Sequence, residues 1–403
     1  MITENAPILA DYGRSYLQLV LEIDKHIDGY IDAYYGPADL KTAVATTGKK
    51  DPAALLNDVA WLQANIPTAD PQRAAYLNAA LRAIDCTVRL LNGEQFAYTE
   101  EVARLYDIIP EPVAESQFEI AHRELDTLLP GQGSLAERIE ARRQRYFVHK
   151  AQILPLLELA RAETRRRTTA LVDLPDDEGV EIRLAANQPW GAYNWYLGNG
   201  RSLIEFNTDV PTSALRLVST FAHEGYPGHH TESMLKETRL YQQKGYAEQA
   251  AMLLHSPAAV IAEGIATHAV AIIFPDDSHH QWTCDVLLPE AGIETGETAV
   301  QMARITQANH QLRYVTGNAA LGYHSGQLSQ EQAIDYIQTY GLVTPERAAK
   351  SFSFLSHPLF RSYIFTYTQG YDLIEQAANG SGKTALFRRL LTEQILPSQL
   401  NNF

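Results

Sequence analysis

The chain has 403 residues and a formal net charge of −15, and this acidic balance argues against nucleic-acid binding, which requires basic surface. Apolar residues make up 45% of it and charged residues 20%, the proportions of a soluble globular protein with a core large enough for two lobes. Two cysteines cannot build a disulfide framework, no apolar run approaches the ~20 residues that span a bilayer, and residues 1–19 contain no apolar segment of signal length. We therefore expect a cytosolic protein with neither nucleic acid nor membrane as a partner.

The first part of the chain is predicted to be helical. Apolar residues recur at three- and four-residue spacing through residues 8–170, as expected for helices with one buried face. Clusters of Pro and Gly, such as YYGPADL and LLPGQGS, separate these segments. The first buried stripe is predicted to run through Tyr16, Leu17, Val20, Ile23, Ile27, Tyr30 and Ile31.

A change of composition after residue 179 predicts strands. The segments VEIRLAA, AYNWYLG and RSLIEFN are rich in β-branched and aromatic residues. Gly198-Asn199-Gly200 lies between the last two, and such residues favour a hairpin turn. From Thr212 the pattern is helical again, nearly to the C-terminus. The predicted fold class is mainly α with a small antiparallel β-sheet.

The stretch FAHEGYPGHHTE follows these strands and begins like the His-Glu-x-x-His signature of zinc proteases. His223 and Glu224 fit that pattern, but Pro227 stands where the second histidine belongs. On a straight helix His223 and His230 would share a face yet lie ~10.5 Å apart, too far for one metal ion. We predict that Pro227 and Gly228 together bulge the helix, so that a later histidine again faces the metal.

A third ligand is expected from a later helix. The segment HSPAAVIAEGIATHAV places Glu263 in an apolar helical context, where an unpaired carboxylate is costly and a metal ion would offset the cost. In zincins an edge strand runs beside the active-site helix and holds extended substrate by main-chain bonds. The strand RSLIEFN precedes the motif in the order that this arrangement requires.

The motif HEGYPGHH resembles the HExxPGHH signature of the bacterial domain of unknown function family 885, which is grouped with gluzincin-type metallopeptidases. Further similar segments occur in the same order: AYYGPADL, NWYLGNGRSLIEFNTDVP, AEGIATHA, LGYHSGQLSQEQAIDYI and YTQGYDLI. The resemblance covers most of the chain and implies a helical zincin fold and a metal-dependent hydrolase. One position departs from the family, because Val270 stands where members often carry an acidic residue that could support a metal ligand.

The resemblance also implies roles for individual residues. Alignment with the Gly-His of related HExGH enzymes selects His229 as the second histidine ligand, beside His223 and Glu263. His230 then contacts a metal ligand without touching the metal, or it faces substrate as a catalytic residue. The alternative is that His230 is itself the second histidine ligand. Tyr367 in YTQG resembles the family's Tyr-x-x-Gly position and is expected to stabilise an oxyanion, with a core tyrosine as the alternative.

Other polar residues have plainer interpretations. Tyr323 and His324 in LGYHSG resemble another family segment, or they pack a helix end. Arg313 or Arg361 could pair with a substrate carboxylate, although helix salt bridges are the simpler reading. NGSGKTALF looks like a phosphate loop, but Ala377 stands where that pattern requires glycine and the segment before it is helical, so no nucleotide is expected.

These observations predict a peptidase or amidase that holds one Zn²⁺ per chain and cleaves short peptides or small amides. Glu224 would take a proton from the attacking water and Tyr367 would stabilise the oxyanion. Residues 1–170 are expected to form a helical N-terminal lobe that covers the cleft, and residues 171–403 a zincin-like catalytic region. The competing hypothesis is a non-hydrolytic helical protein that binds metal or peptide at a decayed zincin site. Substrate identity, endo- or exo-cleavage and oligomeric state stay open.

Overall fold

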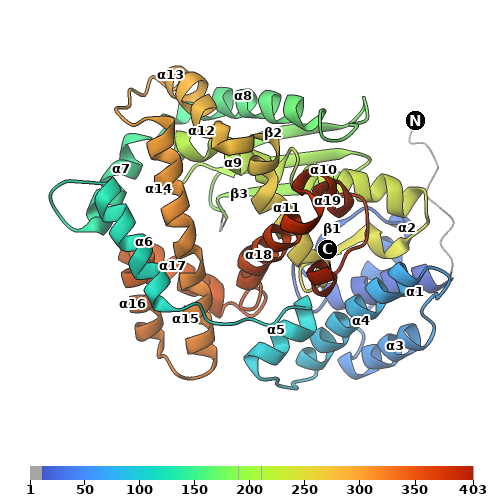
Figure 1. Cartoon of the computed structure of the whole chain (residues 1–403). Helices are drawn as coiled ribbons and strands as arrows, with labels where there is room; N and C mark the ends of the chain where they lie inside the picture. The colour runs from blue at the N-terminus through green and yellow to red at the C-terminus, as the bar shows by residue number, and fades with distance from the viewer. Residues whose placement is uncertain (1–10, 189, 210, 403) are drawn as a thin grey trace.

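The structure of the protein is a computed structural model that describes residues 11–188, 190–209 and 211–402. Helices make up most of it, and two small sheets lie among them (Figure 1). The predicted class, mainly α with a small sheet, is therefore confirmed. The expectation that the N-terminus lacks a signal segment concerns residues 1–19, of which the first ten lie outside the described residues.

Helices fill the chain up to residue 168, as predicted, apart from one strand. They are α1 (Asp11–Asp24), α2 (Ala38–Ala45), α3 (Pro52–Ala64), α4 (Pro71–Leu91), α5 (Tyr98–Tyr106), α6 (Glu115–Leu128), α7 (Leu135–Arg145) and α8 (Lys150–Thr168). The predicted stripe is buried along α1, but the prediction is wrong for its last three members, which lie beyond the helix. There the chain turns at Gly29, whose φ of +78° suits glycine, and Ile31 begins β1 (Ile31–Tyr34).

The larger sheet has three strands, β2 (Gly179–Ala185), β3 (Ala192–Gly198) and β4 (Arg201–Asn207), in the order β2-β4-β3. β3 and β4 form the predicted antiparallel hairpin, and Gly198, Asn199 and Gly200 all have positive φ at its turn. β2 pairs with β4 in parallel. β4 is thus the central strand, so the prediction that RSLIEFN is an edge strand is wrong. The edge strands are β2 and β3.

A second sheet joins distant parts of the chain. β1 pairs antiparallel with β5 (Ala251–Leu253), which lies in a region predicted to be helical throughout. The register shifts between Ile31 and Ala33, so Asp32 sits at an irregularity of the ladder. This pairing brings a segment from the beginning of the chain beside the helices that carry the zinc motif.

The C-terminal half is helical apart from β5. Its α-helices are α9 (Ala214–Glu224), α10 (His229–Lys236), α11 (Pro257–Ile273), α12 (Ser278–Trp282), α13 (Leu288–Glu290), α14 (Ala299–Gln311), α15 (Val315–His324), α16 (Gln330–Gly341), α17 (Pro345–Ser356), α18 (Ile364–Ser381) and α19 (Lys383–Leu390). A π-helical segment, Glu237–Gln242, continues α10. The phosphate-loop look-alike lies across α18 and α19, where no strand precedes it in the described chain.

Two glycines allow α11 and α18 to touch at the centre of the molecule (Figure 1). A Cβ on Gly370 would lie 2.4 Å from the carbonyl oxygen of Val260, and a Cβ on Gly264 would lie 2.7 Å from that of Gly370. Both distances are shorter than any carbon–oxygen contact, so only glycine fits at either position. The two backbones therefore meet directly where the helices cross.

The core combines residues from both sides of residue 170. One apolar cluster includes Leu157 of α8, Ile204 of β4 and Phe221 of α9, with Phe387 of α19. Among the described residues no single helix is long and apolar enough to cross a membrane, although one bent pair, Pro257–Ile273 with Pro275–Glu290, meets that test together.

Candidate metal centre

The zinc motif folds as two helices with a break between them. Apolar residues of α9 recur at three- and four-residue spacing and bury one face, and the helix ends at Glu224. Residues 225–228 leave the helical path, and α10 begins at His229. The predicted bulge within one helix is therefore wrong. Pro227 lacks the amide for a continuing helix, and the chain starts a new helix at His229 instead.

Gly228 makes the break compact. Its amide donates a hydrogen bond to the carbonyl of Ala222, six residues back, at 3.0 Å. A Cβ at this position would lie 1.9 Å from the carbonyl oxygen of His223 and 2.5 Å from that of Ala222. No side chain fits there, so the turn depends on the small size of glycine as well as on its backbone freedom. This close return places the start of α10 against the end of α9.

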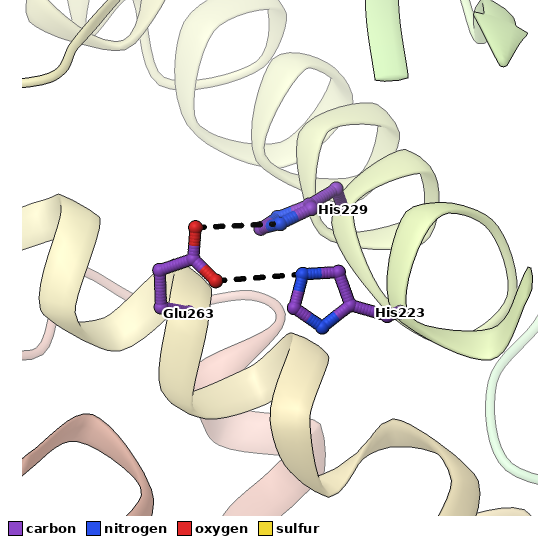
Figure 2. Close-up of side chains that lie close together, drawn as sticks. All are labelled: His223, His229 and Glu263. Atoms are coloured by element: carbon purple, nitrogen blue, oxygen red, sulfur yellow. Dashed lines mark ion pairs between the residues drawn. The ribbon is translucent and has the colours of Figure 1, made fainter. Parts of the chain in front are cut away.

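The break brings three predicted ligands together. Nε2 of His223 lies 3.4 Å from Oε2 of Glu263, and Nε2 of His229 lies 3.8 Å from Oε1 (Figure 2). Figure 2 shows both imidazoles facing the carboxylate, which comes from α11 on the opposite side. One ligand atom from each residue lies within 4.8 Å of the others. His229, and not His230, is the histidine that the structure places here.

The protonation states suit a cation. Burial lowers the pKa of His229 to about 4, and burial followed by the neighbouring His229 also lowers the pKa of His223. Both imidazoles are therefore neutral near pH 7 and have a lone pair to offer. Burial raises the pKa of Glu263, which a hydrogen bond from Tyr363 at 2.8 Å opposes. A positive ion between these groups would favour the ionised carboxylate.

The hydrogen bonding of one buried oxygen indicates whether a metal ion fits between these residues. Oε2 of Glu263 is buried and has no hydrogen-bond partner among the described residues. An unsatisfied buried carboxylate oxygen is costly, and coordination would satisfy it. Two ligands of a tetrahedral zinc ion, each about 2.1 Å from it, lie roughly 3.4 Å apart, close to the separations found here. Two neutral imidazoles and one carboxylate are also a known donor set of catalytic zinc, so the residues fit the ion.

Two predicted catalytic residues lie in the cavity that contains this trio. The cavity measures about 860 Å³, and both Glu224 and Tyr367 line it. Burial, and then the charge of Asp32, raise the pKa of Glu224 to about 8. The carbonyl of Glu224 accepts a hydrogen bond from the side chain of Asn194 on β3 at 2.5 Å, which holds the end of α9 to the edge strand. Tyr367 is packed edge-on against Tyr363.

The crossing of α11 and α18 positions the residues that face the trio. Glu263 directly precedes Gly264 on α11, and Tyr367 lies one turn before Gly370 on α18. Since the two glycines hold the backbones in contact, these side chains are brought to one side of the crossing. Tyr363, one further turn back, reaches Glu263. Val270, the departure from the family pattern, is partly buried against the apolar core and gives Glu263 no polar support.

His230 lies outside the cavity lining and is fully buried. Its Nδ1 accepts a hydrogen bond from the hydroxyl of Ser202 at 2.8 Å, and its Nε2 lies 3.0 Å from Oε2 of Glu178. A carboxylate only accepts, so Nε2 carries the proton. The hydroxyl of Tyr226 donates to the same oxygen of Glu178 at 2.5 Å, and Arg165 donates to the other at 2.7 Å. His230 thus fixes the start of α10, and its placement gives it no contact with substrate.

Several residues that the structure brings to the site were not predicted from the sequence. Glu178 clamps the break, Tyr363 holds a ligand, and Asp32 lines the cavity, where the hydroxyl of Tyr193 donates to it. Asp32 and Glu178 precede or follow glycine-rich turns and carry no local signal. Tyr363 offered one, because it lies four residues before Tyr367 and so shares its helix face.

The lesser candidates take structural roles. Nε2 of His324 donates a hydrogen bond to the carbonyl of Leu355 at 2.8 Å. Arg313 pairs with Asp372, and Arg361 pairs with Glu101. The salt-bridge interpretation of both arginines therefore holds, and none of these three residues lines the cavity.

Comparison with known proteins gives a fold and no family. No protein-family model matches the chain, and no curated protein matches it. A solved structure of a protein described as a putative lipoprotein from Colwellia psychrerythraea matches with a TM-score of 0.53 and 14% identity, covering 98% of this chain and 76% of the other. A second, described as a putative lipoprotein of unknown function from Shewanella oneidensis, has a TM-score of 0.49 and 15% identity, covering 97% and 72%. At these identities the likeness concerns the fold alone.

This comparison corrects the expected location. The prediction of a cytosolic protein is wrong, because the matching fold belongs to a protein described as a putative lipoprotein. The prediction failed because it relied on the number of cysteines and on the lack of a long apolar run. A protein held at a membrane by an attached lipid needs neither disulfides nor a spanning helix, so few cysteines and the lack of a long apolar run do not identify a compartment.

Proposed function

We propose that the protein is a zinc-dependent hydrolase, a peptidase or amidase with a zincin-like (gluzincin) site of the kind that the resemblance to the domain of unknown function family 885 implies. The observation that carries the proposal is the convergence of His223, His229 and Glu263 on one buried, unsatisfied carboxylate oxygen. Glu224 lies beside them in a cavity large enough for a short peptide.

Zinc held by the trio would supply Lewis-acid activation of a water molecule and of the scissile carbonyl. The chain supplies the proton chemistry. Glu224 lines the cavity beside the trio, where its carboxylate can take a proton from the attacking water and pass it to the leaving amine. Tyr367 keeps its proton, since burial and then Glu263 raise its pKa, and it donates to the developing oxyanion.

Two further elements of the site suit an extended, short substrate. The edge strand β3 lines the cavity along residues 192–196 and can pair with a peptide backbone. Tyr16, Tyr35 and Tyr76, all from the first 170 residues, line the same cavity. They form part of its wall, which supports the proposal that the N-terminal lobe covers the cleft and excludes folded proteins.

The test is the replacement Glu224→Gln, with Glu181→Gln on the exposed face of β2 as the control. We expect Glu224→Gln to bind one equivalent of zinc, as measured by metal analysis, while its turnover of a mixed library of short peptides falls by roughly 10²- to 10⁴-fold. Glu181→Gln should behave as the wild type. Near-full activity in Glu224→Gln would contradict the base assignment. A zinc-loaded wild type that cleaves no peptide or amide would favour the non-hydrolytic alternative.

A further inference from the structure

Asp32 projects from an irregular point of β1 into the cavity. The ladder between β1 and β5 shifts register on either side of it, and such irregularities re-aim a side chain away from its ordinary direction. Ala33 turns into the core, whereas Asp32 lines the cavity and accepts a hydrogen bond from the hydroxyl of Tyr193 on β3. Asp32 lines the same cavity as His223, Glu224 and Glu263.

Asp32 is half-buried at the cavity wall and has no cation beside it in the described chain, unlike Glu232 and Glu248 of the same cavity. Glu232 pairs with Lys236 at 2.6 Å, and Glu248 pairs with Arg73 at 2.8 Å. No ion pair of Asp32 occurs among the described residues. A carboxylate removed from water without a positive partner is costly, and a ligand cation would offset that cost.

Buried polar atoms of the cavity that lack a hydrogen-bond partner also favour a cationic ligand. Oε2 of Glu232, a residue only 3% exposed, and Oδ1 of Asn194 are buried acceptors without a hydrogen-bond partner in the described chain. Nε2 of Gln249 is a buried donor that also lacks a hydrogen-bond partner there. Acceptors thus outnumber donors, and they suit a group rich in N–H donors. An ammonium group has three donors and a positive charge.

We propose that Asp32, oriented by Tyr193, binds an ammonium group of the substrate, so that the site selects peptides or amides with a free amino group. This inference rests on the proposed function for its substrate class. The ammonium can belong to a peptide N-terminus or to a lysine side chain. Both make the same charge-assisted hydrogen bonds to a carboxylate.

Binding can be measured without turnover in the Glu224→Gln protein loaded with zinc, and again after chelation. The probes are tri-alanine, N-acetyl-tri-alanine and an N-acetylated tripeptide with lysine, each titrated by calorimetry. We expect tri-alanine to bind roughly tenfold more tightly than its acetylated form. Asp32→Asn, which keeps the size and the contact with Tyr193, should abolish that difference. Asp335→Asn, at an exposed aspartate that does not line the cavity, is the matched control and should preserve it.

Equal affinity for the free and acetylated peptides, the same preference in Asp32→Asn, or no binding of any probe would overturn the proposal. Tight binding of the acetylated lysine peptide would place the ammonium on a side chain, and its weak binding would place it at the N-terminus. The readout is independent of hydrolysis. Amine-dependent binding by a protein that cleaves nothing would refute the proposed function alone, and cleavage without amine preference would refute this inference alone.

Discussion

Glu178 holds the break between α9 and α10 to the start of α10. Its side chain is fully buried, and it accepts hydrogen bonds from Tyr226 within the break and from His230 after it. Arg165 supplies the compensating charge. Burial alone would raise the pKa of Glu178, but the donors from His230, Tyr226 and Arg165 outweigh it and lower the pKa to about 2. The carboxylate therefore stays ionised in the folded protein far below its ordinary range.

This pKa predicts a loss of stability in acid. The folded-state pKa of about 2 lies below the ordinary value of 4.5, so the contribution of Glu178 is present above pH 4.5 and is lost as the pH falls towards 2. The difference corresponds to about 3 kcal/mol in the free energy of unfolding. Denaturant unfolding of the wild type and of Glu178→Gln, followed across this range, measures it.

The variant isolates this one carboxylate from the others that titrate in the same range. At pH 7 Glu178→Gln should be less stable by about 3–5 kcal/mol, since it leaves the donors around it unpaired in a buried site. The difference in the free energy of unfolding between the wild type and Glu178→Gln should become smaller as the pH falls. Two stability curves that run parallel from pH 5 to pH 2 would show that Glu178 does not keep its charge.

At the same scale, the residues of the candidate metal centre were easier to predict from the sequence than the residues around them. His223 and Glu263 could be predicted because a histidine-glutamate pair and a glutamate in an apolar helix are locally unusual. Glu178 and Asp32 could not, since a carboxylate next to a turn is ordinary in sequence. Only the tertiary contacts with Tyr226 and Tyr193 distinguish them.

The break between α9 and α10 sets the geometry of the ligands through backbone contact. Because a Cβ on Gly228 would lie 1.9 Å from the carbonyl oxygen of His223, even the smallest side chain forces the two helices apart. We predict that Gly228→Ala lowers zinc affinity at least roughly tenfold and stability by about 1–3 kcal/mol. Competition with a chromophoric chelator and denaturant unfolding measure the two effects.

Gly48→Ala serves as the control, since a Cβ at Gly48 meets nothing within 4 Å and its φ is not positive. It should leave both quantities unchanged. If Gly228→Ala bound zinc as the wild type does, the spacing of His223 and His229 would not depend on this contact. The sequence predicted that a histidine after the Pro-Gly pair would lie beside His223, but it did not predict the form of the break, because Pro-Gly is compatible with both a bulge and a new helix.

On the scale of the whole molecule, the site is assembled from parts far apart in the chain. β1 contributes Asp32, α9 and α10 the histidines, and α11 and α18 the remaining polar groups. Core residues from α8 to α19 pack in one cluster. We therefore predict that zinc stabilises the entire fold. At free zinc about 100 times its Kd, the gain is about 2.7 kcal/mol, or an increase in Tm of about 3 °C for a chain of this length.

Calorimetry with and without a chelator measures this shift, and His223→Ala should show none. Since the core is shared, one transition should carry the whole heat of unfolding. A separate transition whose Tm does not change with zinc would show that part of the chain unfolds independently of the metal centre.

The sequence also predicted the helical character of the chain and the hairpin, because both have periodic signals several residues long. It missed the pairing of β1 with β5, since strands of four and three residues are too short to show alternation. It could not order the larger sheet either. Parallel pairing of β2 with β4 depends on a connection through β3 that no local pattern specifies.

The contact between Gly264 and Gly370 can also be used to find distant relatives of this chain. Each glycine is required by the other, so the two should be kept or lost together during evolution. Glu263 directly precedes the first, and Tyr363 and Tyr367 precede the second by two turns and one. Glu-Gly in one helix and Tyr-x-x-x-Tyr-x-x-Gly in a later helix thus form a paired signature. It should persist in homologues whose overall identity has fallen as low as the 14% seen for the matching fold, where whole-chain alignment fails.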